Sequence, residues 1–154
     1  MTSPKRVMII AWGSRGDLQP AASLALSLKK VGRDVIVFGT PSATSLIQDN
    51  AIDYVVAKEN VAEFVENMFG RADLSDRSIS GLIKLAKFAK AYLNSPDYVS
   101  TQKADMKSAY AAAHDFKPDA LVVPNLIYGP LMCIAEALHI PLISYDLQIN
   151  HPSS

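Results

Sequence analysis

The sequence has one cysteine, no excess of either charge and no long hydrophobic run, and each absence narrows what the protein can be. Because Cys133 is the only cysteine among 154 residues, the chain forms no internal disulfide, which fits a reducing compartment. Cys133 lies in an apolar stretch, where we expect it to pack as a small hydrophobic residue. Basic and acidic residues number 15 each, so any basic surface that could meet nucleic acid or a membrane must be local.

Metal-binding and targeting signals are also missing. The three histidines, His114, His139 and His151, are scattered without the spacing of a metal site, so we expect no metal and no resident cofactor. The first six residues carry charge and lead directly into an apolar strand, which excludes a secretory signal peptide. No apolar run is long enough to span a bilayer. These features predict a soluble, cytoplasmic protein.

What the sequence does contain is enough apolar material for one sizeable core. Hydrophobic residues make up 49% of the chain and charged residues 19%, which predicts a single folded domain over residues 1–154. Short apolar runs typical of buried strands alternate with segments in which apolar residues recur every three or four positions, as they do in helices. The expected strands are 7–11, 34–38, 53–57, 120–123 and 141–145, and the expected flanking helices are 21–31, opened by Pro20, 42–50 and 130–138.

The middle of the chain, residues 58–116, carries no strand signal. Helical spacing predicts helices over 61–69, 79–93 and 96–115, with a loop over 70–77. In the second of these helices, three lysines, Lys84, Lys87 and Lys90, run beside the apolar stripe. They suggest either a helix that lies on a membrane surface or, as we prefer, the solvated outer face of an ordinary domain helix.

The alternation of strands and helices predicts an α/β fold: a Rossmann-like, doubly wound parallel sheet in three layers, with strand order 3-2-1-4-5. In such sheets, ligands bind where the strand order reverses, outside the carboxyl ends of the strands. Here that point lies between the first and fourth strands. We therefore expect the loops that begin at Gly13, Pro124 and Asp146 to converge on one ligand site.

The most informative motif follows the first strand. Residues 13–20 read Gly-Ser-Arg-Gly-Asp-Leu-Gln-Pro, and the two glycines Gly13 and Gly16 permit a tight turn before a helix. The motif is not a phosphate-binding Walker loop, because no Gly-Lys-Ser/Thr follows. It is not the dinucleotide fingerprint either, because the third glycine is missing.

Asp17 stands at the mouth of this turn and has two interpretations. It can be the N-cap of the following helix, or it can be a general base that takes a proton from a hydroxyl in the crevice. Both can hold together, since a carboxylate near a helix N-terminus is stabilised as the anion. That stabilisation weakens the base, so a catalytic Asp17 would need a second group to accept or share the proton.

The three loops also supply candidates for binding a ligand. Trp12 is either a packing residue, which we favour, or an aromatic wall for a ring. Asp146 either orients a ligand or caps its loop. The other candidates for ligand contact are Ser14, Arg15, Asn125 and His151.

Two segments resemble a known family. The run 13–20, with Leu24-Ala25 and Val31-Gly32-Arg33-Asp34-Val35, is similar to the amino-terminal signature of sterol glucosyltransferases and antibiotic glycosyltransferases of the GT-B fold. Residues 134–141, preceded by Pro124-Asn125, are similar to that family's helix into the last strand of the sheet. The chain departs from the family at Arg33, where histidine is usual, and at His139, where glycine or asparagine is more usual.

The resemblance implies an inverting transferase that moves a sugar from a nucleotide diphosphate, a UDP-sugar, to the hydroxyl of a lipid, sterol or other small acceptor. It implies that this chain is the acceptor-binding half and that the residue matching Asp17 is the catalytic base. The donor-binding half carries a His- and Gly-rich motif that nothing in this sequence matches. We therefore expect the partners to be an acceptor and a donor-binding domain or subunit, and expect no turnover by this chain alone.

Two other functions stay open on the sequence. A free-standing, non-catalytic domain could recruit a separate donor-binding subunit, with peripheral membrane contact as one version of that role. A flavodoxin-like ligand-binding module is the other, and the glycine motif argues against it. The sugar, the acceptor and the oligomeric state are not specified by the sequence.

Overall fold

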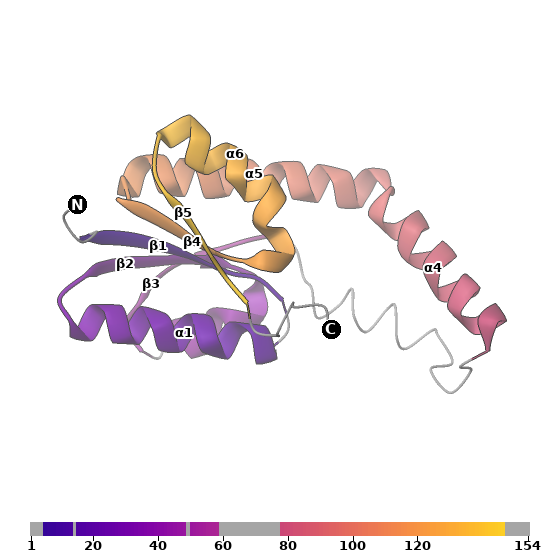
Figure 1. Ribbon diagram of the computed structural model, residues 1–154, viewed down its shortest axis with the longest axis horizontal. Coiled ribbons are helices and arrows are strands. Elements are labelled where there is room, and N and C mark those ends of the chain that lie inside the picture. Colours follow the sequence, from indigo (N-terminus) through magenta and orange to yellow (C-terminus); the bar gives the residue numbers. More distant parts are fainter. Residues whose placement is uncertain (1–4, 14, 49, 59–77, 147–154) are drawn as a thin grey trace, which may run out of the picture.

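A parallel sheet of five strands forms the centre of the protein (Figure 1). The computed structural model describes residues 5–13, 15–48, 50–58 and 78–146. The strand order is β3-β2-β1-β4-β5, so the predicted fold class and order are confirmed. The strands are β1 (Arg6–Ala11), β2 (Asp34–Gly39), β3 (Asp53–Val56), β4 (Ala120–Pro124) and β5 (Leu142–Tyr145).

Helices cover both faces of the sheet and complete three layers (Figure 1). On one face lie α1 (Arg15–Lys30) and α2 (Thr44–Gln48), and on the other lie α5 (Pro96–Phe116) and α6 (Tyr128–Leu138). Short 3-10 turns, η1 (Pro41–Ala43) and η2 (Asn125–Ile127), follow β2 and β4. A further helix, α4 (Ile79–Leu93), extends away from the sheet beyond the start of α5.

Two apolar cores form because β1 is buried on both faces. Val7 and Ile9 point toward α1, whereas Met8 and Ile10 point toward α5 and α6, as strand alternation requires. All four side chains are at most 3% exposed. A central strand of this kind holds the sheet and both helix layers in register.

Two expectations about helices on these faces are wrong. Helix α1 begins at Arg15, so Pro20 lies inside it rather than in its first turn. The helix starts almost directly after Gly13, because this turn needs so few residues to reverse the chain. Cys133 is exposed, since α6 turns Leu131 and Ile134 toward the sheet and leaves Cys133 on the outer side.

The middle of the chain agrees in part with the helices and loop predicted from the sequence. Helices α4 and α5 occupy the predicted ranges, whereas the predicted helix 61–69 and loop 70–77 lie outside the described residues. The apolar stripe of α4, which resembled that of an ordinary domain helix, is not buried in the core. Ile79, Leu82 and Ile83 are exposed, and α4 has no buried residue, because it extends beyond the sheet that would cover it.

Close approach of β1 and β2 at their carboxyl ends makes glycine necessary at position 39. A Cβ on Gly39 would overlap the carbonyl oxygen of Ala11, its partner in β1. We expect Gly39→Ala to reduce the free energy of unfolding by about 1–3 kcal/mol, because backbone must shift to relieve the overlap. Urea denaturation measures this loss.

Gly129 provides the matched control. A Cβ there meets no atom within 4 Å, and the residue lies in α6. Gly129→Ala should therefore be neutral or stabilise the protein by up to about 1 kcal/mol. Equal effects of the two substitutions would contradict the account of the β1–β2 contact.

Candidate functional site

The carboxyl ends of β1, β4 and β5 lie together at one edge of the sheet, as the strand order requires (Figure 1). Pro124 at the end of β4 pairs with Tyr145 at the end of β5. Asn125 and Asp146 therefore follow neighbouring positions, and both are exposed. This edge is where open parallel sheets bind their ligands.

At the end of β1, the side chain of Asp17 lies against Gly13. Gly13 has a φ of +128°, a conformation that side chains rarely adopt. A Cβ at this position would lie 2.5 Å from Oδ2 of Asp17. The carboxylate of Asp17 therefore folds back over the glycine and occupies the space that a side chain would need.

The position of Asp17 in α1 excludes the N-cap interpretation and leaves the general-base interpretation open. It lies in the first turn of α1, two residues after Arg15, so it is inside the helix and is not the N-cap. The N-cap half of the prediction is wrong because the helix begins earlier than its apolar pattern. The half-buried carboxylate still lies at the positive end of the helix dipole.

Tyr145 approaches the same carboxylate from β5. Its hydroxyl donates a hydrogen bond to the carbonyl oxygen of Ile10, 3.2 Å away. Burial, and then the negative charge of Asp17, raise the pKa of Tyr145 to about 12. The hydroxyl is therefore protonated at neutral pH and links β5 to β1 on the α1 side of the sheet.

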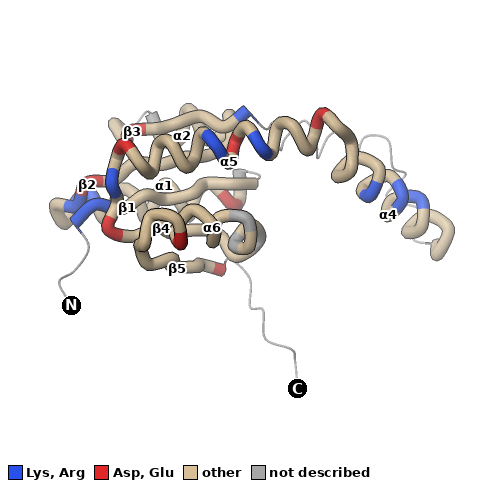
Figure 2. Tube along the Cα trace, turned by 90° about the horizontal axis from the view of Figure 1, so that it is seen from above, with Lys and Arg blue, Asp and Glu red and all other residues tan. Residues whose placement is uncertain are grey.

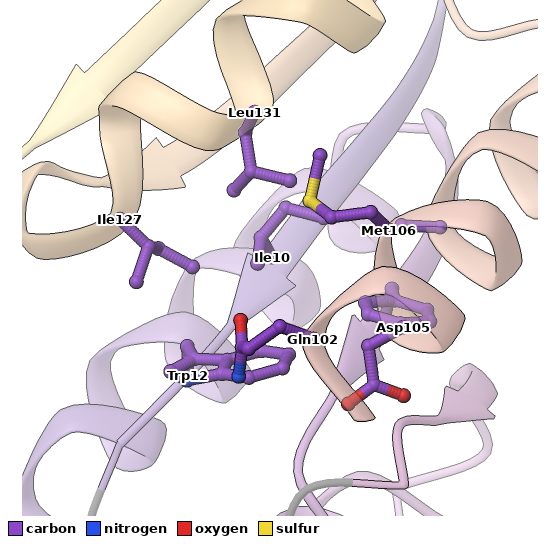
Figure 3. A pocket seen from close by; sticks show the side chains of 9 residues that line it. Ile10, Trp12, Gln102, Asp105, Met106, Ile127 and Leu131 are labelled. Atoms are coloured by element: carbon purple, nitrogen blue, oxygen red, sulfur yellow. The ribbon is translucent and has the colours of Figure 1, made fainter. Parts of the chain in front are cut away.

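A pocket opens on the other side of the sheet, between β1, α5 and the start of α6 (Figure 3). It is partly open to solvent, and its empty space, with the solvent at its mouth included, is about 340 Å³. Most of its lining is apolar. The lining residues are Ile10, Trp12, Phe38, Gln102, Asp105, Met106, Ala109, Ile127 and Leu131.

Trp12 is both a packing residue and a wall of this pocket. Its ring stacks on that of Phe38, with centroids 6.4 Å apart and planes 18° from parallel. The indole is half-buried, so part of it remains accessible in the pocket. Packing fixes the orientation of the ring, and a fixed ring is a suitable surface for a flat ligand.

Two polar side chains of α5 enter the pocket. Asp105 is only 2% exposed, and its Oδ1 accepts a hydrogen bond from the backbone N–H of Lys58 at 2.6 Å. This bond ties α5 to the chain after β3. Gln102 lies one turn earlier, and Figure 3 shows its amide beside Trp12. The pocket is thus apolar with a polar wall.

The acid and the pocket lie on opposite faces of the sheet. Asp17 belongs to α1, whereas the pocket lies among the residues that pack against α5 and α6, and Asp17 does not line it. Trp12 and Gly13 separate the two at the end of β1. A ligand that contacts both Asp17 and the pocket must therefore pass around this end of the strand, where Gly13 contributes no side chain.

Of the remaining candidate residues, only some lie in the part of the chain that the structure describes. Gly16 is exposed in the first turn of α1, and Arg15 is the first residue of that helix. Ser14 and His151 lie outside the described residues. Of the candidates from the three loops, the structure thus gathers Trp12, Gly13, Asp17, Asn125 and Asp146 at one edge.

Sequence reasoning missed Tyr145, Phe38, Gln102 and Asp105. A signal for Asp105 was present, because it stands at helical spacing from the buried Ala109 and Ala113. A charged residue in such a line is either paired or functional. Tyr145 gave no comparable signal, since an aromatic residue at the end of a strand is ordinary.

Metal and membrane motifs were sought in the part of the chain that the structure describes. There, no group of three or more His, Cys, Asp or Glu side chains is arranged to hold a metal ion. Within the same residues, every helix is too short or too polar to cross a membrane.

Solved structures that are similar to this chain include glycosyltransferases. The Streptomyces sp. SF2575 glycosyltransferase SsfS6, complexed with thymidine diphosphate, is similar over 96% of this chain, with a TM-score of 0.63 and 20% identity. The calicheamicin glycosyltransferase CalG4 is similar over 98%, with a TM-score of 0.64 and 14% identity. VinC, in complex with dTDP, is similar over 94%, with a TM-score of 0.61 and 21% identity.

The likeness covers nearly all of this chain but a minor part of those enzymes. The chain spans 40% of the SsfS6 chain, 35% of VinC and 32% of CalG4. No protein-family model and no curated protein matches the chain. The chain therefore has the Rossmann-like α/β fold of a part of GT-B glycosyltransferases.

The hydroxyl of Tyr145 leads to a prediction about alkaline stability. Because its folded-state pKa, about 12, exceeds the ordinary value of 10, its stabilising contribution is complete below pH 10 and is lost as the pH rises toward 12. Tyr145→Phe should remove this part of the pH dependence. At neutral pH the variant should be less stable by about 1 kcal/mol, the usual contribution of one hydrogen bond.

Urea denaturation at pH 8 and between pH 10 and 12 measures both effects. Tyr54 also has a raised pKa, caused by burial, so a smaller alkaline loss should remain in the variant. An unchanged alkaline loss after Tyr145→Phe would contradict this role of the buried hydroxyl.

Proposed function

We propose that this chain is the acceptor-binding half of an inverting, sugar-nucleotide-dependent glycosyltransferase whose acceptor is an apolar alcohol such as a lipid or sterol. One observation carries the proposal. An acid is held against a glycine turn at the end of β1, and an apolar pocket opens near the same strand end on the other face of the sheet, in a fold that glycosyltransferases share. The motif at residues 13–20 supports the assignment to the acceptor side.

The pocket is suited to the apolar body of the acceptor. Its floor is formed by Ile10 of β1, Phe38 of β2 and Trp12, which directly follows β1, and Met106 and Leu131 close it from the helices. A flat or branched hydrocarbon gains about 25 cal/mol for each Å² of apolar surface buried there. In this proposal Gln102 and Asp105 contact a second polar group of the acceptor.

The acceptor hydroxyl then passes around the end of β1 to Asp17. Its proton moves to the carboxylate, its oxygen forms a bond to the anomeric carbon of the sugar, and the bond from that carbon to the nucleotide diphosphate breaks. The diphosphate leaves with the bonding electrons, and the anomeric configuration inverts. Positioning Asp17 over Gly13 orients the base before the acceptor binds.

The donor is a nucleotide diphosphate sugar, with UDP as the expected nucleotide, and binds to a part of the enzyme other than this chain. Two observations support this division. The described chain contains no His- and Gly-rich diphosphate motif, and it spans less than half of the glycosyltransferases that it resembles. The donor half is a second domain of the same protein or a separate subunit.

Asp17→Asn tests the chemistry. In the enzyme that unites this chain with its donor half, we expect kcat to fall by about 10²–10⁴-fold while KM for the acceptor stays within about twofold, because the amide cannot take the proton. The assay follows transfer of labelled sugar from a UDP-sugar to sterols and lipid alcohols. Ile127→Trp should show the opposite pattern, with a raised acceptor KM, because it fills the pocket.

Each variant has a matched control in this chain. Asp97 also lies in the first turn of a helix, α5, and is exposed, so Asp97→Asn should leave kcat unchanged. Met132 is exposed on α6, so Met132→Trp should leave KM unchanged. Full activity of Asp17→Asn would remove Asp17 as the base, and absence of transfer to every alcohol would favour a non-catalytic binding domain.

A further inference from the structure

Helix α4 presents an apolar surface that the rest of the described chain does not cover. Ile79 is 78% exposed, Leu82 60%, Ile83 49% and Leu93 46%. Counted from Ile79, the other three follow after 3, 4 and 14 positions, so all four share one side of the helix. Together with Ala86 they define the outer stripe of α4.

Packing against the domain does not account for this stripe, because α4 uses a different side for that purpose. Leu85, Phe88 and Tyr92, spaced by three and four residues, are half-buried, as is Ala89. Tyr92 contacts Tyr98 of α5, with ring centroids 5.1 Å apart. The helix is therefore apolar on an inner and an outer side, and only the inner side is used within the described chain.

The charges of α4 are all positive. Lys84 and Lys87 are exposed beside the outer stripe, and Lys90 is exposed within it, seven positions after Ile83. The segment Ile79–Leu93 contains no Asp or Glu. Figure 2 shows this segment with blue positions and no red one, whereas both colours occur over the rest of the tube. In a chain with 15 basic and 15 acidic residues, such a segment is a local basic surface.

The junction with α5 holds this surface away from the sheet. Ser78 caps the start of α4 through a hydrogen bond from the N–H of Gly81, 3.1 Å long. At the other end, Asn94 donates its side-chain N–H to the carbonyl of Lys90, and Ser95 caps α5 directly afterward. With so short a connection, the two helices form a corner, and α4 projects beyond the domain (Figure 1).

We propose that α4 binds flat on an anionic lipid surface, with its outer stripe inserted among the acyl chains and its lysines among the headgroups. A helix with aliphatic residues on one side and lysines beside them is the form that lies in a bilayer interface. With 15 residues, α4 is shorter than the roughly 20 that a spanning helix needs. The proposal does not depend on glycosyl transfer.

Charge argues for lipid over a second copy of this chain. In a symmetric dimer through the outer stripe, both helices would bring the same three lysines and no acid to the contact, so like charges would face each other. An anionic membrane instead complements the charge of each lysine. Aliphatic side chains without polar partners suit acyl chains equally well.

Vesicle co-sedimentation of the full chain tests the proposal. We expect binding to vesicles of phosphatidylcholine with phosphatidylserine to exceed binding to phosphatidylcholine alone by at least about tenfold. The triple variant Lys84→Glu/Lys87→Glu/Lys90→Glu should weaken the anionic binding by about tenfold or more. Leu82→Gln/Ile83→Gln should weaken it to a similar degree, because the apolar anchor is lost.

The matched control makes the same change in net charge on other helices. Lys30, Lys103 and Lys107 are exposed on α1 and α5, so their joint replacement by Glu should leave vesicle binding within about twofold. Circular dichroism confirms that each variant keeps its helices, which is expected because every altered side chain is exposed.

Three results would overturn the proposal. One is no preference for phosphatidylserine vesicles, and another is an equal loss of binding in the control triple variant. The third is a dimer that becomes monomeric with Leu82→Gln/Ile83→Gln, measured by sedimentation velocity, since a second copy would then cover the stripe. None of these results bears on transfer activity, so this test and that of Asp17 can fail separately.

Discussion

The contact between Gly13 and Asp17 is the constraint on which the candidate site depends. Gly13 adopts a φ of +128°, and the carboxylate of Asp17 fills the volume that any side chain at this position would take. The chain can therefore reverse from β1 into α1 almost at once, and the acid is directed to the end of the strand. A larger residue at position 13 would displace both the turn and the acid.

The rest of the edge is organised around this contact. Tyr145 joins β5 to β1 on the side of Asp17, while Trp12 turns to the opposite side and stacks on Phe38. Two environments result, a charged one on the α1 side and an apolar one on the α5 side, with only the end of β1 between them. A substrate with an apolar body and a single reactive hydroxyl fits such a division, and this fit is the physical basis of the proposed transferase function.

The sequence predicted the parts of the fold that follow from local pattern. Buried runs such as 7–11 and 120–123 are typical of inner strands, and the glycine turn after the first of them marked the edge of the sheet where the candidate site lies. Patterns that depend on tertiary contacts were less informative. The stripe of α4 has the spacing of a core helix, but no spacing tells whether a sheet lies opposite it, and Ile79 is exposed. Asp105 and Tyr145 join the site only because α5 and β5 fold toward β1.

A crystal structure of the protein with a bound sterol tests the central claim most directly, because it locates both ends of the acceptor at once. The account predicts that the ring system lies against Trp12 and Met106, and that the sterol hydroxyl passes the end of β1 to lie within roughly 2.6–3.2 Å of the Asp17 carboxylate, the distance for proton transfer. A sterol bound on the α1 side of the sheet, or one whose hydroxyl points to Asp105 and away from Asp17, would contradict it.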